Sequence, residues 1–166
     1  MPDLEQLQRN LRERGFECSY FPTAKEAADY LDGKIDGCTV GMGGSMTIQQ
    51  LGLMDRLPKH NDFRSHWAGG TWADSEGTQV YLCSVNGLAE TGEIVNIDGS
   101  GNRVAATIYG HQELYLVVGI NKITPDYESA LWRARNIAAP RNAQRLGVDT
   151  PCAKLGDRCY DCRSPQ

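Results

Sequence analysis

The stretch Thr39-Val-Gly-Met-Gly-Gly-Ser-Met-Thr-Ile48 gives the strongest indication of how this chain folds. It overlaps the end of a short apolar run, Cys38 to Val40, and it precedes apolar residues at helical spacing, Ile48, Leu51 and Leu53. An apolar run, a cluster of glycines and then a helical period predict a strand, a tight turn and a helix. This order is typical of proteins that alternate strands and helices.

The glycine turn is also a candidate anion site. Glycine carries no Cβ, so backbone N–H groups at Gly43 and Gly44 can approach a ligand, and the start of a helix presents N–H donors with positive partial charge. Ser45 and Thr47 would add hydroxyls, either to the ligand or as caps for the helix. The pattern matches neither a Walker A loop nor a complete dinucleotide-binding fingerprint.

A second turn-rich region, residues 84–110, follows the apolar run Val80 to Cys83. Polar side chains are dense in it, which favours recognition of a small polar ligand, although surface turns around a short hairpin strand at Glu93 to Ile97 would have the same composition. Arg103 is the candidate anion clamp, because a guanidinium can grip a carboxylate or phosphate through two hydrogen bonds; an ion pair with Asp98 is the alternative. The other candidate ligand-binding residues here are Ser84, Asn86 and Asn102.

Three carboxylates of the same region are candidates for catalysis. A carboxylate whose pKa is shifted by its surroundings can act as a general acid, a general base or a nucleophile. The candidates are Glu90, Glu93 and Asp98, with exposure in solvated turns as the alternative.

Composition limits the classes of protein to which the chain can belong. It has 166 residues, of which 40% are hydrophobic and 23% charged, with a formal net charge of -4. These values are ordinary for one globular domain, and the lack of a basic run excludes nucleic acid as the expected partner. Residues 1–8 resemble no targeting signal, and no stretch is apolar enough for membrane insertion. We therefore expect a cytoplasmic protein.

Periodicity along the chain predicts a three-layer α/β/α sandwich with a mostly parallel sheet. Continuous apolar runs at Gln79 to Val85 and Leu114 to Ile120 are typical of parallel strands covered on both faces. A capping box at Thr23 to Glu26 opens a helix, and Arg103 to Tyr109 is expected to be another. A strand is predicted at Phe16 to Phe21.

Three further segments complete this description. Helical spacing predicts an N-terminal helix between Pro2 and Gly15. Residues 57–78 show no period and read as a long loop, whose Trp67 and Trp72 would either cover a pocket or anchor the loop by packing. A helix is expected to follow Thr124, with Pro140 kinking or restarting it.

The C-terminal segment contains three closely spaced cysteines, Cys152, Cys159 and Cys162. In a reducing compartment such thiols bind metal more often than they form disulfides, so an iron–sulfur cluster or zinc is a candidate cofactor. Both generally take four ligands, so three cysteines leave one missing. A mobile tail with free or oxidised thiols is the alternative.

Taken together, these segments resemble the lactate-utilisation (LUD) domain family over most of the chain. The resemblance is carried by Val40 to Thr47, Ser84 to Asn86, Glu90 to Arg103, Val118 to Ile123, Arg135 to Pro140, Asn142 to Gly147 and the tail from Thr150 to Pro165. It implies a LUD-type domain at residues 1–150, a cysteine-containing tail at 151–166, and a fold similar to ribose-5-phosphate isomerase, glucosamine-6-phosphate deaminase and the coenzyme A transferases. By position, Glu93 is the nearest analogue of the transferases' catalytic glutamate.

Two functions of different classes remain, the first implied by the resemblance and the second by the glycine loops. The first is an accessory subunit in the oxidation of lactate to pyruvate, working with iron–sulfur partner proteins. The second is a small-molecule enzyme or binding protein that acts on a carboxylate, sugar phosphate or acyl-coenzyme A at the two glycine loops. Either function requires a small anionic ligand.

Overall fold

The computed structural model of the chain describes residues 2–162. These residues form two compact units, each assembled from segments that are distant in the sequence. Unit 1 contains the residues up to 18, residues 85–101 and the residues from 119 onward, and unit 2 contains residues 19–84 and 102–118. The expected division of the chain into a domain ending at residue 150 and a tail stays a prediction.

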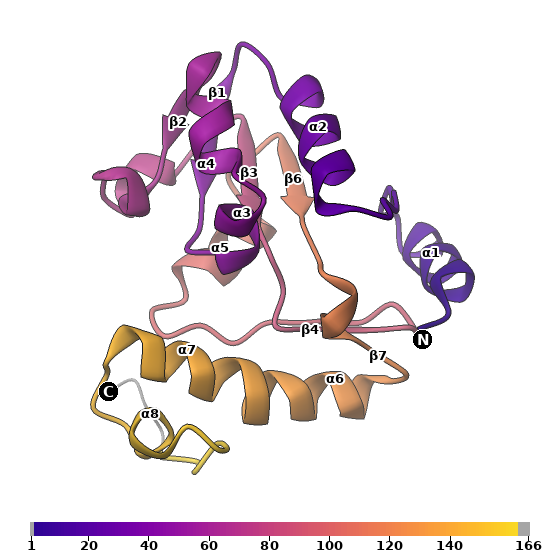
Figure 1. Cartoon of the computed structure of the whole chain (residues 1–166), viewed down its shortest axis with the longest axis vertical. Helices are drawn as coiled ribbons and strands as arrows, with labels where there is room; N and C mark the ends of the chain where they lie inside the picture. Colours follow the sequence, from indigo (N-terminus) through magenta and orange to yellow (C-terminus); the bar gives the residue numbers. More distant parts are fainter. Residues whose placement is uncertain (1, 163–166) are drawn as a thin grey trace. The chain divides into compact units, whose positions relative to one another are not determined.

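Unit 2 is built around a four-stranded parallel sheet. Its strand order is β2 (Asp62–Arg64), β1 (Thr39–Met42), β3 (Val80–Cys83) and β6 (Glu113–Leu116) (Figure 1). All three neighbouring pairs are parallel, so the four carboxyl ends lie at the same edge. The two apolar runs that predicted parallel strands are confirmed as β3 and β6.

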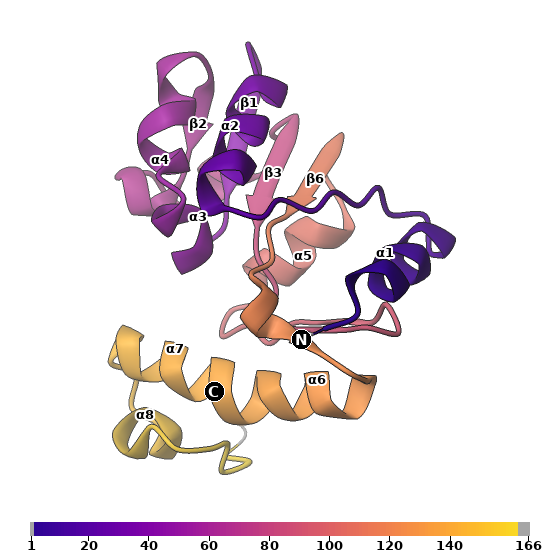
Figure 2. The same ribbon diagram turned by 45° about the vertical axis from the view of Figure 1, so that its right-hand side comes forward.

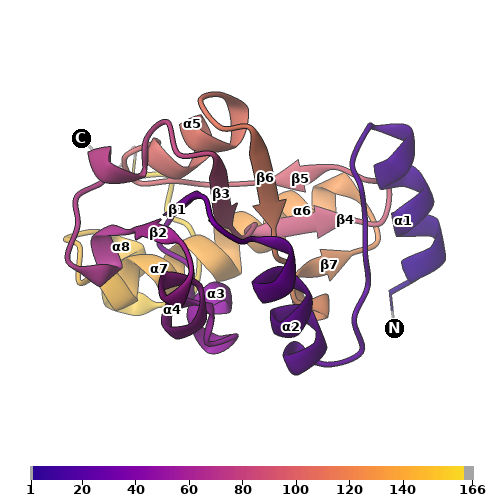
Figure 3. The ribbon, with the colours of Figure 1, turned by 90° about the horizontal axis from the view of Figure 1, so that it is seen from above.

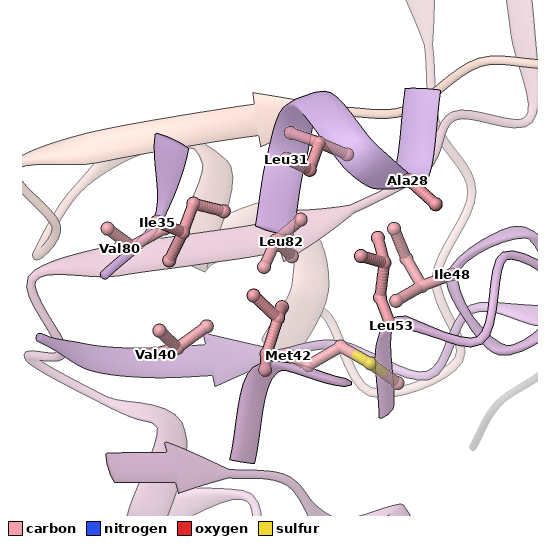
Figure 4. Close-up of a cluster of buried hydrophobic side chains, with 10 residues drawn as sticks. Ala28, Leu31, Ile35, Val40, Met42, Ile48, Leu53, Val80 and Leu82 are labelled. Carbon is pink, nitrogen blue, oxygen red and sulfur yellow. The ribbon is translucent and has the colours of Figure 1, made fainter. Parts of the chain in front are cut away.

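One face of this sheet carries the apolar core of unit 2. Side chains alternate between faces along a strand, so Val40 and Met42 of β1 share a face with Val80 and Leu82 of β3. Helices α2 (Ala24–Lys34), α3 (Met46–Gln50) and α4 (Leu53–Arg56) cover this face with the side chains seen in Figure 4, which include Ala28, Leu31, Ile35, Ile48 and Leu53. The predicted capping box begins α2, because the Thr23 hydroxyl accepts a hydrogen bond from the Glu26 N–H.

Helix α5 (Asn102–Ile108) lies on the other face of the same sheet, beside β3 (Figure 2). Helices therefore flank the parallel sheet on both sides, which confirms the predicted α/β sandwich. The expected helix at Arg103 to Tyr109 is confirmed within one residue at each end.

Unit 1 contains a smaller, mixed sheet. Strand β4 (Gly87–Ala89) lies between β5 (Ile94–Val95), with which it pairs antiparallel, and β7 (Ile123–Thr124), with which it pairs parallel (Figure 3). Helix α6 (Tyr127–Arg133) packs on β4 through Ala130. The helix α1 (Leu4–Glu13) confirms the predicted N-terminal helix and belongs to the same unit.

Helix α6 continues without a break into α7 (Ala139–Leu146) through a π-helical segment, η5 (Ala134–Ala138) (Figure 1). Proline has no N–H to donate and its ring crowds the preceding turn, so the widened turn just before Pro140 accommodates it. The helix is thus irregular just before Pro140, and a kink or restart at that residue stays a prediction. Helix α8 (Pro151–Leu155) then packs against α7.

Two expectations about secondary structure are wrong. Residues 16–21 form no strand: Phe16 and Tyr20 are exposed, and the segment has no pairing partner among the described residues, so aromatic content alone did not make it a strand. Residues 57–78 are not one loop. They contain β2 and three short 3₁₀ turns, η1 (Leu57–Lys59), η2 (His66–Ala68) and η3 (Ala73–Ser75), because β1 offers Asp62–Arg64 an edge on which to pair.

Other boundaries differ by less. The helical pattern after the glycine turn is divided between α3 and α4 at Gly52, whose φ of 69° a helix cannot continue through. The run that ended at Ile120 finishes as a strand at Leu116 and is followed by the 3₁₀ turn η4 (Ile120–Lys122). Among the helices of residues 2–162, none combines the length and apolar character needed to cross a membrane.

Candidate functional site

The two loops expected to share a site approach each other at the carboxyl edge of the unit 2 sheet. Gly43 directly follows β1, and Arg103 lies in the first turn of α5. A Cβ placed on Gly43 would lie 3.2 Å from Cγ of Arg103. This contact brings Gly43 and Arg103 together at one edge of the sheet, and their use as a ligand site stays a prediction.

Gly43 also has a reason to be glycine that involves no ligand. The same Cβ would lie 2.5 Å from the hydroxyl oxygen of Tyr81, a distance that no real Cβ tolerates. Tyr81 is 2% exposed, so its ring cannot move aside easily. The absence of a side chain at Gly43 is therefore required for the buried tyrosine to lie between β1 and Arg103.

Gly44 is exposed, but a tryptophan lies beside it. A Cβ placed on Gly44 would lie 3.1 Å from the Cζ2 and Nε1 atoms of Trp67, which is in the turn after β2. The indole therefore packs over the glycine turn, and its other neighbours are residues of the unit 2 core. This position is compatible with both sequence interpretations of Trp67, as a cover for a pocket and as an anchor for its loop.

The hydroxyl of Ser45 acts as the cap of α3. Its Oγ accepts a hydrogen bond from the Ile48 N–H at 3.3 Å, and the residue is buried. Capping was one of the two roles expected from the sequence. Thr47 lies half-buried in the first turn of the same helix.

Arg103 is oriented by the end of β3. Its Nη1 donates a hydrogen bond to the Ser84 carbonyl at 2.8 Å. The Ser84 hydroxyl in turn donates to the Val117 carbonyl at 2.5 Å, which ties the ends of β3 and β6 together. Asn102, which begins α5, precedes the arginine and is half-buried. The guanidinium is thus held in a fixed direction at the sheet edge, as an anion clamp requires.

The candidate catalytic carboxylates belong to unit 1, together with Asn86. Glu93 forms an ion pair with Arg14 of α1 at 3.0 Å, and it accepts a hydrogen bond from the Thr91 hydroxyl. These contacts, led by the Thr91 hydrogen bond, lower the pKa of Glu93 below its usual value. A general acid at neutral pH requires a raised pKa, so this environment favours an ionised, structural Glu93.

Glu90 is also engaged with the N-terminal segment. Its Oε1 accepts a hydrogen bond from the Asp3 N–H at 3.1 Å, and its carbonyl accepts one from the Asn10 side chain at 2.7 Å. Both Glu90 and Glu93 therefore attach α1 to the turn between β4 and β5. Their proposed catalytic role stays a prediction.

Asn86 shapes the hairpin of β4 and β5. Its side-chain oxygen accepts a hydrogen bond from the Ile97 N–H at 2.8 Å, and its own N–H donates to the Asn96 side chain at 3.2 Å. Its carbonyl accepts from Arg133. Asp98 lies half-buried in the loop that follows. The catalytic and ligand-binding residues expected from the sequence thus belong to different units: Asn86 and the three carboxylates to unit 1, the others to unit 2.

Comparison with known protein families gives one match. A model of the LUD domain matches residues 4–166. The chain belongs to the LUD domain family. Membership supports a role in lactate utilisation at the level of the family. No curated protein and no solved structure is significantly similar to the chain, and the expected likeness to isomerase and coenzyme A transferase folds stays a prediction.

The tail cysteines of this LUD domain have separate surroundings. The Sγ atom of Cys152 lies 3.2 Å from the Thr150 hydroxyl, and that of Cys159 lies 3.9 Å from Nη2 of Arg135. Within residues 2–162, no three His, Cys, Asp or Glu side chains are gathered closely enough to hold a metal ion. With one ligand short of the usual four, metal binding by Cys152, Cys159 and Cys162 stays a prediction.

Sequence reasoning missed Tyr81 at the sheet edge of this LUD domain. The ring stacks on His111 with centroids 4.7 Å apart, and Nδ1 of His111 lies 2.8 Å from the Thr78 carbonyl. The signal was the alternation within β3: Tyr81 faces away from Val80 and Leu82, and Gly41 of β1 is on that same face. A large ring opposite Gly41 of the neighbouring strand, with Gly43 directly after that strand, is a pattern that could have been recognised.

Proposed function

We propose that this LUD domain is an accessory subunit in the oxidation of lactate to pyruvate, and that it binds a small carboxylate at the carboxyl edge of the unit 2 sheet. The observation that carries the proposal is the contact of Gly43 with Arg103 and Tyr81 at that edge. Ligands of open parallel sheets bind beyond the carboxyl ends of the strands. Family membership supports the lactate part of the proposal.

Arg103 would bind the carboxylate of the ligand. Its hydrogen bond to the Ser84 carbonyl holds the guanidinium in one direction, so little conformational freedom is lost when an anion binds. The Tyr81 hydroxyl borders the same glycine, but Tyr81 is 2% exposed, so it would support the edge from within and not contact the ligand. The guanidinium would select for the carboxylate of a short 2-hydroxy or 2-keto acid.

The accessory role would rest on partners that carry electrons. Lactate oxidation releases two electrons, and iron–sulfur proteins are suited to accept them. The tail cysteines would form part of the surface that meets such partners in the cytoplasm. Because the described residues gather no complete set of metal ligands, the proposal assigns electron transfer to the partners.

The alternative function is an enzyme or binding protein for a carboxylate, sugar phosphate or acyl-coenzyme A. It would use Arg103 for binding and Glu90, Glu93 or Asp98 for catalysis. The Arg14 and Thr91 contacts of Glu93 count against a general acid, whereas an ionised carboxylate could still act as a nucleophile. Turnover by the purified chain without partners would favour this alternative.

Substitution of Arg103 tests the proposed site. Charge-assisted hydrogen bonds contribute about 1.5–3 kcal/mol, so Arg103→Ala should weaken pyruvate and L-lactate binding by roughly tenfold to a hundredfold. Arg103→Lys should recover only part of the affinity, because lysine lacks the planar pair of donors. Calorimetric titration with pyruvate, L-lactate and ribose 5-phosphate measures both effects.

Arg64→Ala is the matched control, since Arg64 is an arginine of the same unit that pairs with Asp62. It should leave the affinity for pyruvate unchanged. Equal affinities of wild type, Arg103→Ala and Arg103→Lys would refute the anion site. Iron content is measured after anaerobic purification, with and without co-purified partners. Iron that appears only with the partners would support the accessory subunit, whereas an enzyme that works alone would not require them.

A further inference from the structure

Unit 1 contains an open groove of about 880 Å³ that none of the residues of the proposed carboxylate site lines. The groove is lined by α6 and η5, by Asn121, Ile123 and Thr124 of η4 and β7, and by Cys159 and Asp161 of the tail that follows α8. Its volume is within the range of about 300–1,000 Å³ that is typical of small-molecule sites. The groove therefore has the size of a binding site.

The helical wall presents an aromatic ring and two arginines. Trp132 is 59% exposed, and both its indole and the Arg135 side chain line the groove. Arg133 is fixed by hydrogen bonds to the Asn121 and Asn86 carbonyls. Positive charge beside an exposed ring suits a flat anion.

The tail already places a carboxylate in this groove. Asp161 forms an ion pair with Nη2 of Arg135. Its φ of 51° is in the left-handed region, which residues other than glycine adopt uncommonly. The Cys159 N–H donates to the Asn136 side chain at 3.3 Å, which anchors the tail on η5 two residues earlier. Asp161 can thus leave Arg135 while the tail stays attached.

We propose that the unit 1 groove binds an organic carboxylate with a flat apolar body, and that Asp161 competes with this ligand for Arg135. The ligand's carboxylate takes the place of the Asp161 carboxylate on the guanidinium, and its apolar body lies against Trp132. Both members of the ion pair are solvent-exposed, at 43% and 78% of their side chains. Exposed ion pairs are weak, so the exchange requires little energy.

Three probes and four variants test the groove. Benzoate carries both required features, benzamide has the ring without the charge, and acetate has the charge without the ring. Arg135→Ala removes the anion partner, and Asp161→Asn removes the competing carboxylate while keeping its shape. Asp157→Asn is the matched control, because Asp157 is a tail aspartate that accepts a hydrogen bond from Tyr160 and does not contact Arg135. Trp132→Phe tests whether the change in tryptophan fluorescence on ligand binding comes from Trp132.

Calorimetry and tryptophan fluorescence at constant low salt measure the affinities. Benzoate should bind more tightly than benzamide or acetate, and Arg135→Ala should weaken it about tenfold or more. Asp161→Asn should tighten benzoate about two- to fivefold, since that is the range that an exposed ion pair can contribute. Asp157→Asn and Arg103→Ala should change nothing, and Trp132→Phe should abolish the fluorescence response.

Several outcomes would overturn the proposal. Benzamide binding as tightly as benzoate would remove the anion requirement, and unchanged or weaker benzoate binding in Asp161→Asn would exclude competition by the tail. Absence of benzoate binding in the wild type and in Asp161→Asn would exclude the site. Loss of benzoate binding in Arg103→Ala would assign the probe to the unit 2 edge, so failure of this proposal is distinguishable from failure of the proposed function.

Discussion

The two units of the chain are stabilised by different means. Unit 2 has a continuous apolar core in which large side chains, among them Met42, Ile48 and Leu82, are fully buried. A cluster in unit 1 has smaller residues, Val95 and the alanines at 89, 130 and 134. Unit 1 also buries Leu7, Leu11 and Leu88, and it has polar contacts such as Arg14 with Glu93. Burial of large apolar side chains contributes much more free energy than exposed ion pairs. Unit 2 buries more large apolar side chains than unit 1, so we expect it to carry more of the stability.

Matched leucine truncations test this comparison and should give the largest effect. Leu82 is fully buried in β3, so Leu82→Ala should lower the free energy of unfolding by about 2–5 kcal/mol. Leu131 is half-buried beside the alanine cluster of unit 1, and Leu131→Ala should cost clearly less. Urea unfolding of both variants gives the two values. Equal losses would contradict the comparison.

A double substitution at the glycine turn should give an intermediate effect. Gly43→Ala places a methyl group against the buried Tyr81 hydroxyl, and such overpacking costs about 1–3 kcal/mol. Tyr81→Phe removes the oxygen that would be struck, so it should restore part of the stability lost in Gly43→Ala. Thermal melts of the wild type, the two single variants and the double variant give the interaction energy between positions 43 and 81.

If the losses in the two single variants simply add, then Gly43 is not required by Tyr81. In that case a ligand becomes the better explanation for the glycine. The cycle therefore separates the packing role of Gly43 from its proposed binding role.

The smallest expected effects are on how stability depends on pH. The contribution of His60 in unit 2 is lost as the pH rises, and that of Glu93 in unit 1 is lost as the pH falls. In unit 2, hydrogen bonds to Asp32 and then Asp36 raise the pKa of His60 above its ordinary 6.5. The stability contributed by His60 is therefore complete below pH 6.5 and is lost as the pH rises through the raised pKa. In unit 1, the pKa of Glu93 is lowered from 4.5, so its contribution is complete above pH 4.5 and is lost as the pH falls through the lowered pKa.

Melting temperatures of His60→Gln and Glu93→Gln against pH measure these contributions. The difference between wild type and His60→Gln should shrink on the alkaline side, and that for Glu93→Gln should shrink on the acidic side. A Glu93 difference that grew on acidification would show that its environment raises its pKa, as a general acid requires.

Local patterns predicted the elements of unit 2 well. The capping box at Thr23 and the apolar run of β3 are signals contained within a few residues, and both elements formed as expected. Strand β2 was missed because its three residues, Asp62–Arg64, carry no apolar run, and β1 alone makes them a strand. When pairing with a neighbour makes a segment a strand, the sequence of that segment carries only a weak strand signal.

The candidate site was less predictable for the same reason. Arg103 and Gly43 could be brought together from the rule that parallel strands end at one edge. The partners of Glu90 and Glu93 could not, because Asp3, Asn10 and Arg14 lie some eighty residues earlier in the chain. The carboxylates looked catalytic in isolation, and only the long-range contacts reveal that they hold α1.

The interleaving of the two units has a consequence for how the chain is made. The polypeptide passes between units at residues 18/19, 84/85, 101/102 and 118/119. All of unit 2 has been synthesised once residue 118 is added, whereas unit 1 still lacks its helices α6, α7 and α8. Folding can proceed from the N-terminus during translation. The parallel sheet of unit 2 can therefore fold on the ribosome before the later helices of unit 1 have been synthesised. The residues that line the groove all follow residue 118, so the groove forms only after the unit 2 sheet has been synthesised.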